Sequence, residues 1–563
     1  MQYIRPQLVI TLVGLALVGV VLYSQSQGIQ TILLPSQGGS YIEAVTGRPT
    51  TLNPLLDSEN KANRDLARLL HAGLLRFDGQ GLPVTDLAQS WAVTADGLAY
   101  TFVLRDDIRF SDGELVTIDD VIFTMGLLQD PAFPHSADRA DFWQSVTVVK
   151  LNERSMKVEL PQPFAPFLDY MTFAVLPEHR LPGVTGGALA DHPFNFEPVG
   201  AGPFILAKLD VVDGQIVRVV MTPNPNYYGY ANGAPFIGEI ELRYFERADD
   251  AVAAYLSGEV LAVGDIPPAL LPQVMAAPET ALFTTRKQAY DLVFLNQGRE
   301  ELAFFQDKKV RQALLAGLNR QRMVDMLLNG QAIVATGPIL PGTWAYNKNL
   351  TTVRYDPERA ANLLDEAGWR FPDEVLPGTE DYVRQKAGVV LGFTLTIPDT
   401  PLHQAIAAVM LENWTALGLR VTVAAVPPDT LQSDYLLTRE YEALYTTFSF
   451  AGTPDPDPYP LWHQTQIESG QNYSGYANRG ISELLEQARV NNSLADRAGL
   501  YAAFQARFTD ETPALLLWYP VYNYAVSTRV RGVRVGQVGE PADRFEAVAQ
   551  WYIITRRVVV SQQ

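Results

Sequence analysis

Apolar and polar positions alternate in several short runs of the first half of the chain. Residues 100–104 and 156–160 both show this period of two, which is typical of β-strands that bury one face. Between them, Thr117 and Asp120 have capping-box spacing in front of an apolar stretch, so a helix is predicted to begin there. A second β-rich block is expected over about residues 200–290.

The pattern changes to a helical period after about residue 290. Asp356 can cap a helix that has Pro357 at its first position and Gly368 just past its end. Strand-like runs at 389–397 and 419–426 flank another apolar helical stretch that opens near residue 400. This βαβ arrangement predicts parallel strands with a right-handed crossover, so the second half is expected to be an α/β lobe.

A proline-stiffened loop follows the next predicted strand, 441–450. It reads Ala-Gly-Thr-Pro-Asp-Pro-Asp-Pro over 451–458 and is followed by Tyr459 and Trp462. Parallel sheets place ligands outside the carboxyl ends of their strands. The loop is therefore the first candidate for a binding site; the alternative is a solvent-facing turn whose prolines only end the strand.

An apolar run occupies residues 8–23 and follows Arg5. Its 16 residues lie between a signal-peptide core of about 7–15 and a membrane-spanning helix of about 18–20 residues. We interpret it as an export signal, either cleaved near Ser24 or retained as an anchor with Arg5 on the cytoplasmic side. A buried core helix is the other interpretation. Everything after about residue 40 is expected to lie outside the cytoplasm.

Composition narrows the classes of function. The 563 residues carry a formal net charge of −19, which repels phosphate backbones, so nucleic-acid binding is disfavoured. There is no cysteine, which excludes disulfides and thiolate sites, and the six histidines show no closely spaced ligand pair. We expect no metal and no cofactor.

Catalytic motifs are absent from the sequence. It contains no GxSxG, GxxxxGK[ST] or helix-opening GxGxxG motif. Neighbouring carboxylates such as Asp119 and Asp120 suit the N-terminus of a helix, where the helix dipole explains them. We therefore predict that the chain is not an enzyme and has no catalytic residues. A secreted hydrolase acting on a polymer is kept as the alternative.

Eleven short motifs nevertheless occur in a specific order between about residues 41 and 555. They lie at 82–91, 96–105, 110–113, 117–121, 200–204, 224–228, 309–314, 355–360, 366–369, 455–458 and 472–476. In this order they resemble the family 5 extracellular solute-binding proteins, the dipeptide/oligopeptide-type receptors of ABC importers. Each motif is weak alone, but the ordered set is specific.

The resemblance implies a mixed α/β, two-lobed periplasmic-binding-protein-like fold with an extra β-rich subdomain in lobe I. Crossing segments at 288–292 and 517–520 would form a hinge. The predicted division of the chain is residues 1–23 as signal or anchor, 24–40 as linker, 41–72, 198–288 and 517–556 as lobe I, 73–197 as the inserted subdomain and 289–516 as lobe II.

The same resemblance implies a monomeric receptor that captures a peptide or other small polar solute between its lobes and delivers it to an ABC permease. A ligand sensor without a transporter is the second alternative. The candidate ligand-binding residues are Asn53, Trp344, Ser449, Phe450, Gly452, Asp455, Trp462 and Tyr473. Trp344 and Trp462 are expected in loops.

Two features depart from the family pattern. Peptide-binding members place an aspartate before the Asp-Pro-Asp-Pro stretch to pair with the ligand's α-amino group, but Gly452 takes the equivalent position here. Because a buried ammonium needs a counter-charge, a free peptide N-terminus is a doubtful ligand unless Asp455 or Asp457 reaches it. The chain also lacks the lipidated cysteine of many members, so either residues 8–23 remain as the tether at the outer face of the cell membrane or the protein is free in a periplasm.

Overall fold

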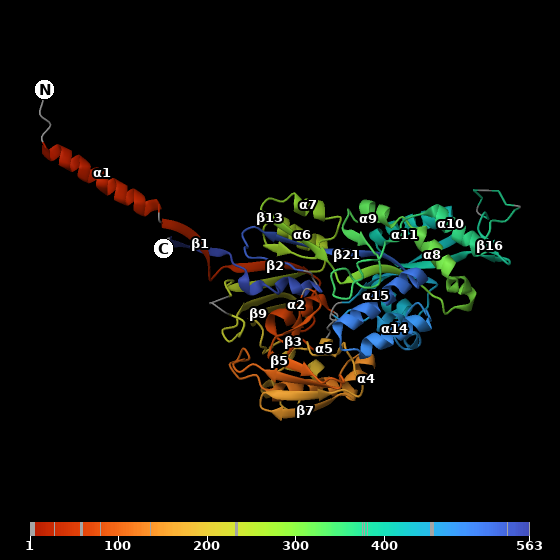
Figure 1. Cartoon of the computed structure of the whole chain (residues 1–563), viewed down its shortest axis with the longest axis horizontal. Helices are drawn as coiled ribbons and strands as arrows, with labels where there is room; N and C mark the ends of the chain where they lie inside the picture. The colour runs from red at the N-terminus through yellow and green to blue at the C-terminus, as the bar shows by residue number, and fades with distance from the viewer. Residues whose placement is uncertain are drawn as a thin grey trace, which may run out of the picture.

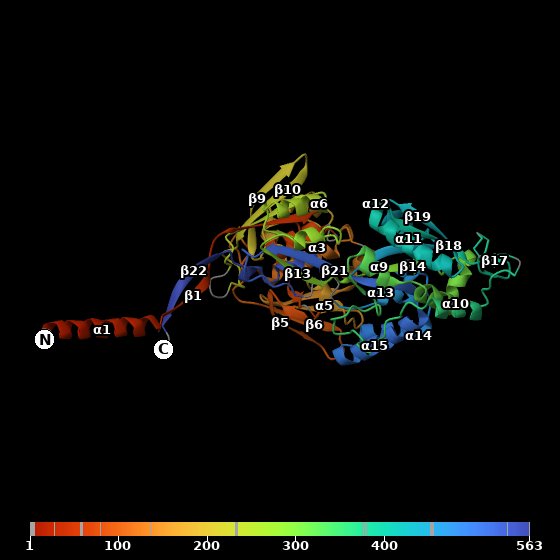
Figure 2. The same cartoon turned by 90° about the horizontal axis from the view of Figure 1, so that it is seen from above.

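The computed structural model describes residues 6–27, 29–56, 60–78, 80–135, 137–230, 235–373, 375–376, 378–379, 381–450, 455–536 and 539–561. Helix α1 (Pro6–Gln27) stands away from a large body that contains the other elements (Figures 1 and 2). Within the described ranges, no helix combines the length and apolar character needed to cross a membrane.

A two-stranded ribbon joins α1 to the body (Figure 1). Strand β1 (Ile29–Ser36) pairs antiparallel with β22 (Ile554–Ser561), from Ile29 opposite Ser561 to Ser36 opposite Ile554. Most of the predicted linker at 24–40 is therefore β-structure. Both segments are rich in β-branched residues, and the end of the chain supplies a partner that local sequence does not reveal.

The body is built around one mixed sheet of 12 strands, in the order β19-β18-β20-β14-β21-β12-β2-β11-β10-β9, with β13 and β15 also paired to β21. Its strands are β2 (Ser40–Thr46), β9 (Phe204–Val212), β10 (Gln215–Pro223), β11 (Glu239–Phe245), β12 (Ala262–Val263), β13 (Thr280–Arg286), β14 (Ala289–Leu295), β15 (Ala332–Val334), β18 (Gly392–Pro398), β19 (Arg420–Val426), β20 (Ala443–Ser449) and β21 (Ala514–Ser527). Strand β18 runs parallel to both β19 and β20, which confirms the predicted βαβ unit.

Strand β21 belongs to both halves of this sheet. Its first part pairs with β14 and β15, and its second part pairs with β12 and β13. The partner changes between Pro520, opposite Ala332, and Val521, opposite Arg286. Next to this point the chain passes from β13 to β14, and the Lys287 N–H donates to the Pro520 carbonyl at 2.9 Å. Two adjacent segments thus connect the halves.

A smaller antiparallel sheet forms its own layer against the body (Figure 1). Its order is β5-β6-β8-β7, with β5 at Ala88–Val93, β6 at Ala99–Leu104, β7 at Thr147–Asn152 and β8 at Ser155–Glu159. The same region holds the pair β3 (Leu75–Phe77) and β4 (Pro83–Thr85) and the helices α3 (Ile118–Gln129), α4 (Ala137–Ser145) and α5 (Phe167–Tyr170). Helix α3 begins directly after Thr117, as its capping-box spacing predicts.

The remaining helices cover the main sheet. They are α2 (Lys61–Leu70), α6 (Ala248–Leu256), α7 (Leu271–Met275), α8 (Lys308–Ala316), α9 (Arg320–Leu327), α10 (Pro357–Glu366), α11 (Pro401–Ala416), α12 (Pro428–Thr430), α13 (Tyr459–Trp462), α14 (Arg479–Val490) and α15 (Leu494–Glu511), beside the short pair β16 (Gln385–Lys386) and β17 (Val389–Val390). Asp356 caps α10 by accepting the Arg359 N–H at 2.9 Å, and Gly368 follows with φ +85°. Both features confirm the predicted helix ends.

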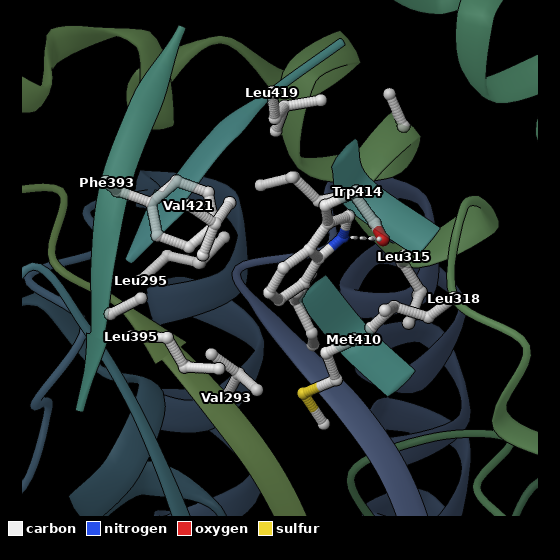
Figure 3. Packing of buried hydrophobic residues seen from close by; sticks show 14 of the residues in the cluster. Val293, Leu295, Leu315, Leu318, Phe393, Leu395, Met410, Trp414, Leu419 and Val421 are labelled. Atoms are coloured by element: carbon white, nitrogen blue, oxygen red, sulfur yellow. Dashed lines mark hydrogen bonds between the residues drawn. The ribbon is translucent and has the colours of Figure 1, made fainter. Parts of the chain in front are cut away.

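The second half has a core centred on a buried tryptophan of α11 (Figure 3). Trp414 packs edge-on against Phe393, with ring centroids 5.3 Å apart, and its indole N–H donates to the Leu314 carbonyl at 3.1 Å. Met410, one turn earlier on the same helix, is also buried in this core. The α11 helix is therefore fixed to the sheet by its apolar face, with the one polar atom of Trp414 satisfied.

The division of the chain into lobes and subdomain at the predicted residue boundaries stays a prediction. Separate cores nevertheless form in each part: one around the small sheet, others around β2 and β11, and others around β14, β18 and β20. These names, inserted subdomain, lobe I and lobe II, are used below for those three regions.

Candidate functional site

The candidate site lies where lobe II meets the inserted subdomain, beyond the end of β20. This strand ends at Ser449, and Phe450 follows it. Residues 451–454, which include the candidate Gly452, lie outside the described residues. The loss of the family aspartate at Gly452 therefore stays a prediction, and the site is built here from Asp455 onward.

Both aspartates of the predicted loop already have a guanidinium partner. Arg497 of α15 donates two hydrogen bonds to the Asp455 carboxylate, at 2.6 and 2.7 Å. The Arg489 Nε of α14 donates to Asp457 at 2.7 Å. Burial raises the pKa of Asp455, and the charge and hydrogen bonds of Arg497 oppose this rise. Neither carboxylate can receive a ligand's ammonium group without sharing or breaking its ion pair.

Aromatic rings extend this charged cluster. The Arg497 guanidinium lies over the Trp344 ring at 4.9 Å, and Arg489 lies over the Tyr459 ring at 3.8 Å. Such stacking stabilises a cation and fixes the plane of its donors. The structure thus brings together two of the predicted site residues, Trp344 and Asp455, through an arginine that the sequence did not single out.

The cluster also reaches across to the inserted subdomain. The Asp455 N–H donates to both carboxylate oxygens of Asp169 in α5, at 3.0 and 3.3 Å. The Ala165 N–H donates to the Arg489 carbonyl at 2.7 Å, and the Arg489 guanidinium lies 5.3 Å from the centre of the Phe164 ring. Lobe II and the inserted subdomain are therefore in direct polar contact in this structure.

Several neighbouring groups shift the pKa of Asp169. Asp169 is partly buried; its desolvation by the surrounding protein raises its pKa above the ordinary value, and the neighbouring charge of Asp455 raises it further. The N–H of Asp455 and the charge of Arg497 lower it by smaller amounts. No local pattern in the sequence marks this residue, because its partner lies 286 positions away.

Other candidates lie in the core of lobe II. Trp462 is 1% exposed and packs against Phe508, with ring centroids 4.7 Å apart. It belongs to the short helix α13 rather than to the predicted loop, because Pro458 and Pro460 favour a helical first turn. Tyr473 is also buried and packs edge-on against Phe294 at 5.6 Å. These two rings support the sheet under the site.

The last three candidates occupy separate places. Phe450 packs against Tyr290 of β14, with ring centroids 5.1 Å apart, and Ser449 is exposed opposite Ala289. Asn53 is buried and donates to the Asn195 side chain at 2.9 Å, so it fastens lobe I to the end of the inserted subdomain. The contacts of Asn53 explain its burial without a ligand.

In the part of the chain that the structure describes, no group of three or more histidine, aspartate or glutamate side chains is arranged to hold a metal ion. The acidic side chains near Asp455 are instead matched by arginines, and arginine does not ligate metals.

Two sheet halves joined by two adjacent crossings form a two-lobed body, and lobe II makes a polar contact with the inserted subdomain. The family model described as bacterial extracellular solute-binding proteins, family 5, middle region, matches residues 83–470. This match covers more than half of the chain. The chain belongs to this family and is an extracytoplasmic substrate-binding receptor, which confirms the class predicted from the ordered motifs.

Relatives and solved structures agree with this assignment. The chain is 26% identical over 527 residues to the oligopeptide-binding protein AppA of Bacillus subtilis (strain 168), covering 92% of each protein. It is 23% identical over 559 residues to the dipeptide-binding protein of Escherichia coli (strain K12), covering 92% of this chain and 96% of that one.

Among solved structures, that of Bacillus subtilis AppA in complex with a nonapeptide is similar with a TM-score of 0.73 at 24% identity, over 92% of this chain and 100% of that one. NikZ of Campylobacter jejuni in complex with Ni(L-His) gives a TM-score of 0.72 at 25% identity, over 91% and 99%. The predicted two-lobed α/β fold is confirmed. The family and these neighbours are binding proteins rather than enzymes.

Proposed function

We propose that this receptor captures a peptide or another small polar solute between lobe II and the rest of the molecule, and presents it to the permease of an ABC importer. The observation that carries the proposal is the polar contact across the two parts, made by Asp455 and Asp169. A solute held at this junction would touch both parts only when they are closed. The receptor would act as a monomer and would carry out no catalytic step.

The two crossing segments act as the hinge for closure of lobe II against the rest of the molecule. Lobe II is joined to the rest of the body through β21 and through Lys287 and Gln288 between β13 and β14. Two adjacent crossings allow rotation about one axis. A solute that binds only the closed form shifts the population toward it by its differential affinity, and the permease can then distinguish loaded from empty receptor.

The ion pairs of Asp455 and Asp457 narrow the chemistry of the solute that the site can bind. The names of the relatives point to oligopeptides, dipeptides and glutathione, and one solved neighbour holds a nickel–histidine complex. In this chain Asp455 and Asp457 are bound by Arg497 and Arg489. We therefore expect affinity to come from burial of the solute and from a few placed polar groups, rather than from either of these carboxylates.

The test is to purify the receptor from its own host, identify co-purifying solutes by mass spectrometry, and return each to the stripped protein in a thermal-shift titration. A true ligand raises the melting temperature and is recovered unchanged; at about 100 times Kd it adds about 2.7 kcal/mol to the stability of the folded state. Conversion of the solute to a product would overturn the proposed receptor function and support the alternative of a secreted hydrolase.

We also propose that α1 tethers the receptor to the outer face of the cytoplasmic membrane. Many described side chains along α1 are apolar and exposed, because this helix does not pack against a hydrophobic core. Leu15 is 65% exposed and Leu17 is 60% exposed. Apolar surface of this kind is stable in lipid and costly in water.

Fractionation of cells tests the tether. The full chain should sediment with membranes, whereas a variant with residues 1–27 replaced by a cleavable export signal should be soluble outside the cytoplasm and still bind its solute. Recovery of the full chain as a soluble protein whose first residue lies near Ser24 would show that the segment is a cleaved signal.

A further inference from the structure

We propose that Asp169 makes closure of this receptor proton-linked: bringing lobe II against the inserted subdomain favours the protonated form of its carboxyl group, so the closed form gains population as pH falls. The inference rests on the proposed closing motion. It assigns to Asp169 the role of a positioning residue that sets how easily the two parts meet, without any contact with the solute being required.

The geometry places Asp169 on the opposite side of the junction from its partners. Asp169 lies in α5 of the inserted subdomain, whereas the Asp455 N–H that it accepts belongs to lobe II. The neighbouring bond from Ala165 to the Arg489 carbonyl also crosses the junction. Opening would break both hydrogen bonds and return the Asp169 carboxylate to water.

Charge at the closed junction is unbalanced. Three carboxylates, Asp169, Asp455 and Asp457, face two guanidinium groups, Arg489 and Arg497, and these two already pair with Asp457 and Asp455. Among the described residues, no cationic side chain forms an ion pair with Asp169. Within the described part of the chain, one negative charge is therefore left without a cationic partner when the parts close, and a single proton removes it.

The remaining titratable groups around the junction do not supply the missing charge. Tyr170 on α5, Tyr100 on β6 and Tyr501 on α15 all have pKa values raised by burial, so they stay neutral and uncharged near pH 7. Arg139 on α4 acts on the pKa of Tyr170 by its charge. Arg139 is itself exposed, and no ion pair between it and Asp169 is formed among the described residues.

The sign of the effect follows from linkage. In the open form Asp169 is solvated and has an ordinary pKa of about 3.9. In the closed form burial and the charge of Asp455 raise its pKa. Between these two values the closed form binds more protons, so the closed-to-open ratio rises as pH falls, by up to about tenfold per pH unit. Above the closed-form pKa the ratio becomes independent of pH again.

Interlobe distance can be measured without knowing the solute, because the native chain has no cysteine. Leu151→Cys on β7 and Met326→Cys on α9, which are 49% and 65% exposed, place one fluorophore on the inserted subdomain and one on lobe II. In the otherwise wild-type receptor, energy transfer between them should report more closed protein at pH 5 than at pH 8.

The variant Asp169→Asn keeps an acceptor for the Asp455 N–H and removes the charge. It should be more closed than wild type at pH 8 and should lose the dependence on pH. Glu153→Gln is the matched control, since Glu153 is an exposed carboxylate in the turn before β8 of the same subdomain, 83% exposed at its side chain; it should titrate like wild type.

A wild-type distance that does not change between pH 5 and 8, or an Asp169→Asn variant that keeps the wild-type titration or closes less, would overturn the inference. Retention of the co-purified solute by Asp169→Asn at pH 8 separates the two proposals. If the variant still binds solute but the wild-type receptor shows no pH effect, the proposed receptor function is supported. Only the proposed role of Asp169 is then contradicted.

Discussion

At the scale of single residues, two buried arginines, Arg544 and Arg320, bind partners from distant parts of the chain. Arg544 donates to Glu43 at 2.7 Å and to both oxygens of Asp65, and so locks the segment before β22 against β2 and α2. Arg320, 3% exposed, instead donates to backbone carbonyls, including that of Leu516 at 2.6 Å, and burial lowers its pKa to about 10. Each arginine thus closes a contact between segments.

His71 should make folding sensitive to acid. It is buried with its ring 3.2 Å from the Leu52 carbonyl, and burial lowers its pKa from 6.5 to about 4. The unfolded state therefore binds more protons between these values, so stability falls as pH falls through that window, by up to about 3 kcal/mol. Urea unfolding of wild type and His71→Gln at pH 7 and pH 4 should show a smaller loss in the variant. An equal loss in both proteins would contradict this.

At the scale of elements, the change of partners on β21 explains how one strand can serve two moving parts. The change falls at Pro520, which has no N–H to donate and accepts from Lys287 through its carbonyl. Fewer ladder bonds at this residue make it the natural place for bending. The parts of β21 on either side are each paired within their own half of the sheet, so each half can keep its own hydrogen bonds during closure.

Helix α3 offers a matched pair of aspartates. Asp120 is buried and accepts from the N–H and hydroxyl of Thr117, both at 2.8 Å, and from the Glu178 N–H at 2.9 Å. Asp119 beside it is exposed and pairs with Lys150. Asp120→Ala should lower the free energy of unfolding by about 2–3 kcal/mol, because buried donors lose their acceptor, whereas Asp119→Ala should cost about 0.5 kcal/mol or less.

Circular dichroism during urea unfolding, with both variants compared to wild type, measures these losses. The prediction for α3 fails if the two substitutions shift the midpoint equally.

Local patterns found in the sequence account for much of the fold. The cap at Asp356, the helix stop at Gly368 and the strands around α11 all depend on residues within one element, and all occur as predicted. Contacts between segments far apart in the chain were not predictable in this way. Neither the pairing of β1 with β22 nor the bond from Asp455 to Asp169 leaves any periodic signal.

In the candidate site too, local features were predictable from the sequence and long-range contacts were not. The sequence pointed to the loop that contains Asp455 because it follows a parallel strand, and the structure places a contact between the two parts there. Trp462 is a candidate because it is an aromatic ring expected in a loop after the proline-rich segment, but it lies in α13 and its ring packs in the core of lobe II. The decisive arginines, Arg489 and Arg497, lie in ordinary amphipathic helices, where a charged residue usually indicates only a solvated face.

At the scale of the whole molecule, β1, which follows α1, and β22, near the other end of the chain, pair in one ribbon. Strand β22 is the last described element, yet it lies beside β1, directly after α1 (Figure 2). The body is therefore connected to α1 through the paired strands β1 and β22, called the stem below, rather than through a single strand. The partner of β1 comes from a segment more than 500 positions further along the chain.

Removal of β22 should expose the stem without harming the body. A chain ending at residue 553 leaves β1 unpaired, and limited proteolysis should then cut between residues 29 and 36 much faster than in the full chain. Truncation after residue 561 keeps all eight pairs and is the control. The main melting transition should move by less than about 2 °C in either case, since the body has its own cores. Unchanged cleavage of β1 would contradict the prediction.

The stem has a mechanical consequence for a receptor tethered by α1. An eight-residue strand at about 3.4 Å per residue spans about 27 Å, whereas eight flexible residues have a typical reach of about 16 Å and point in any direction. A paired stem thus acts as a spacer of set height. It would hold the mouth between the lobes at one level above the bilayer and limit the volume that the receptor searches for its permease.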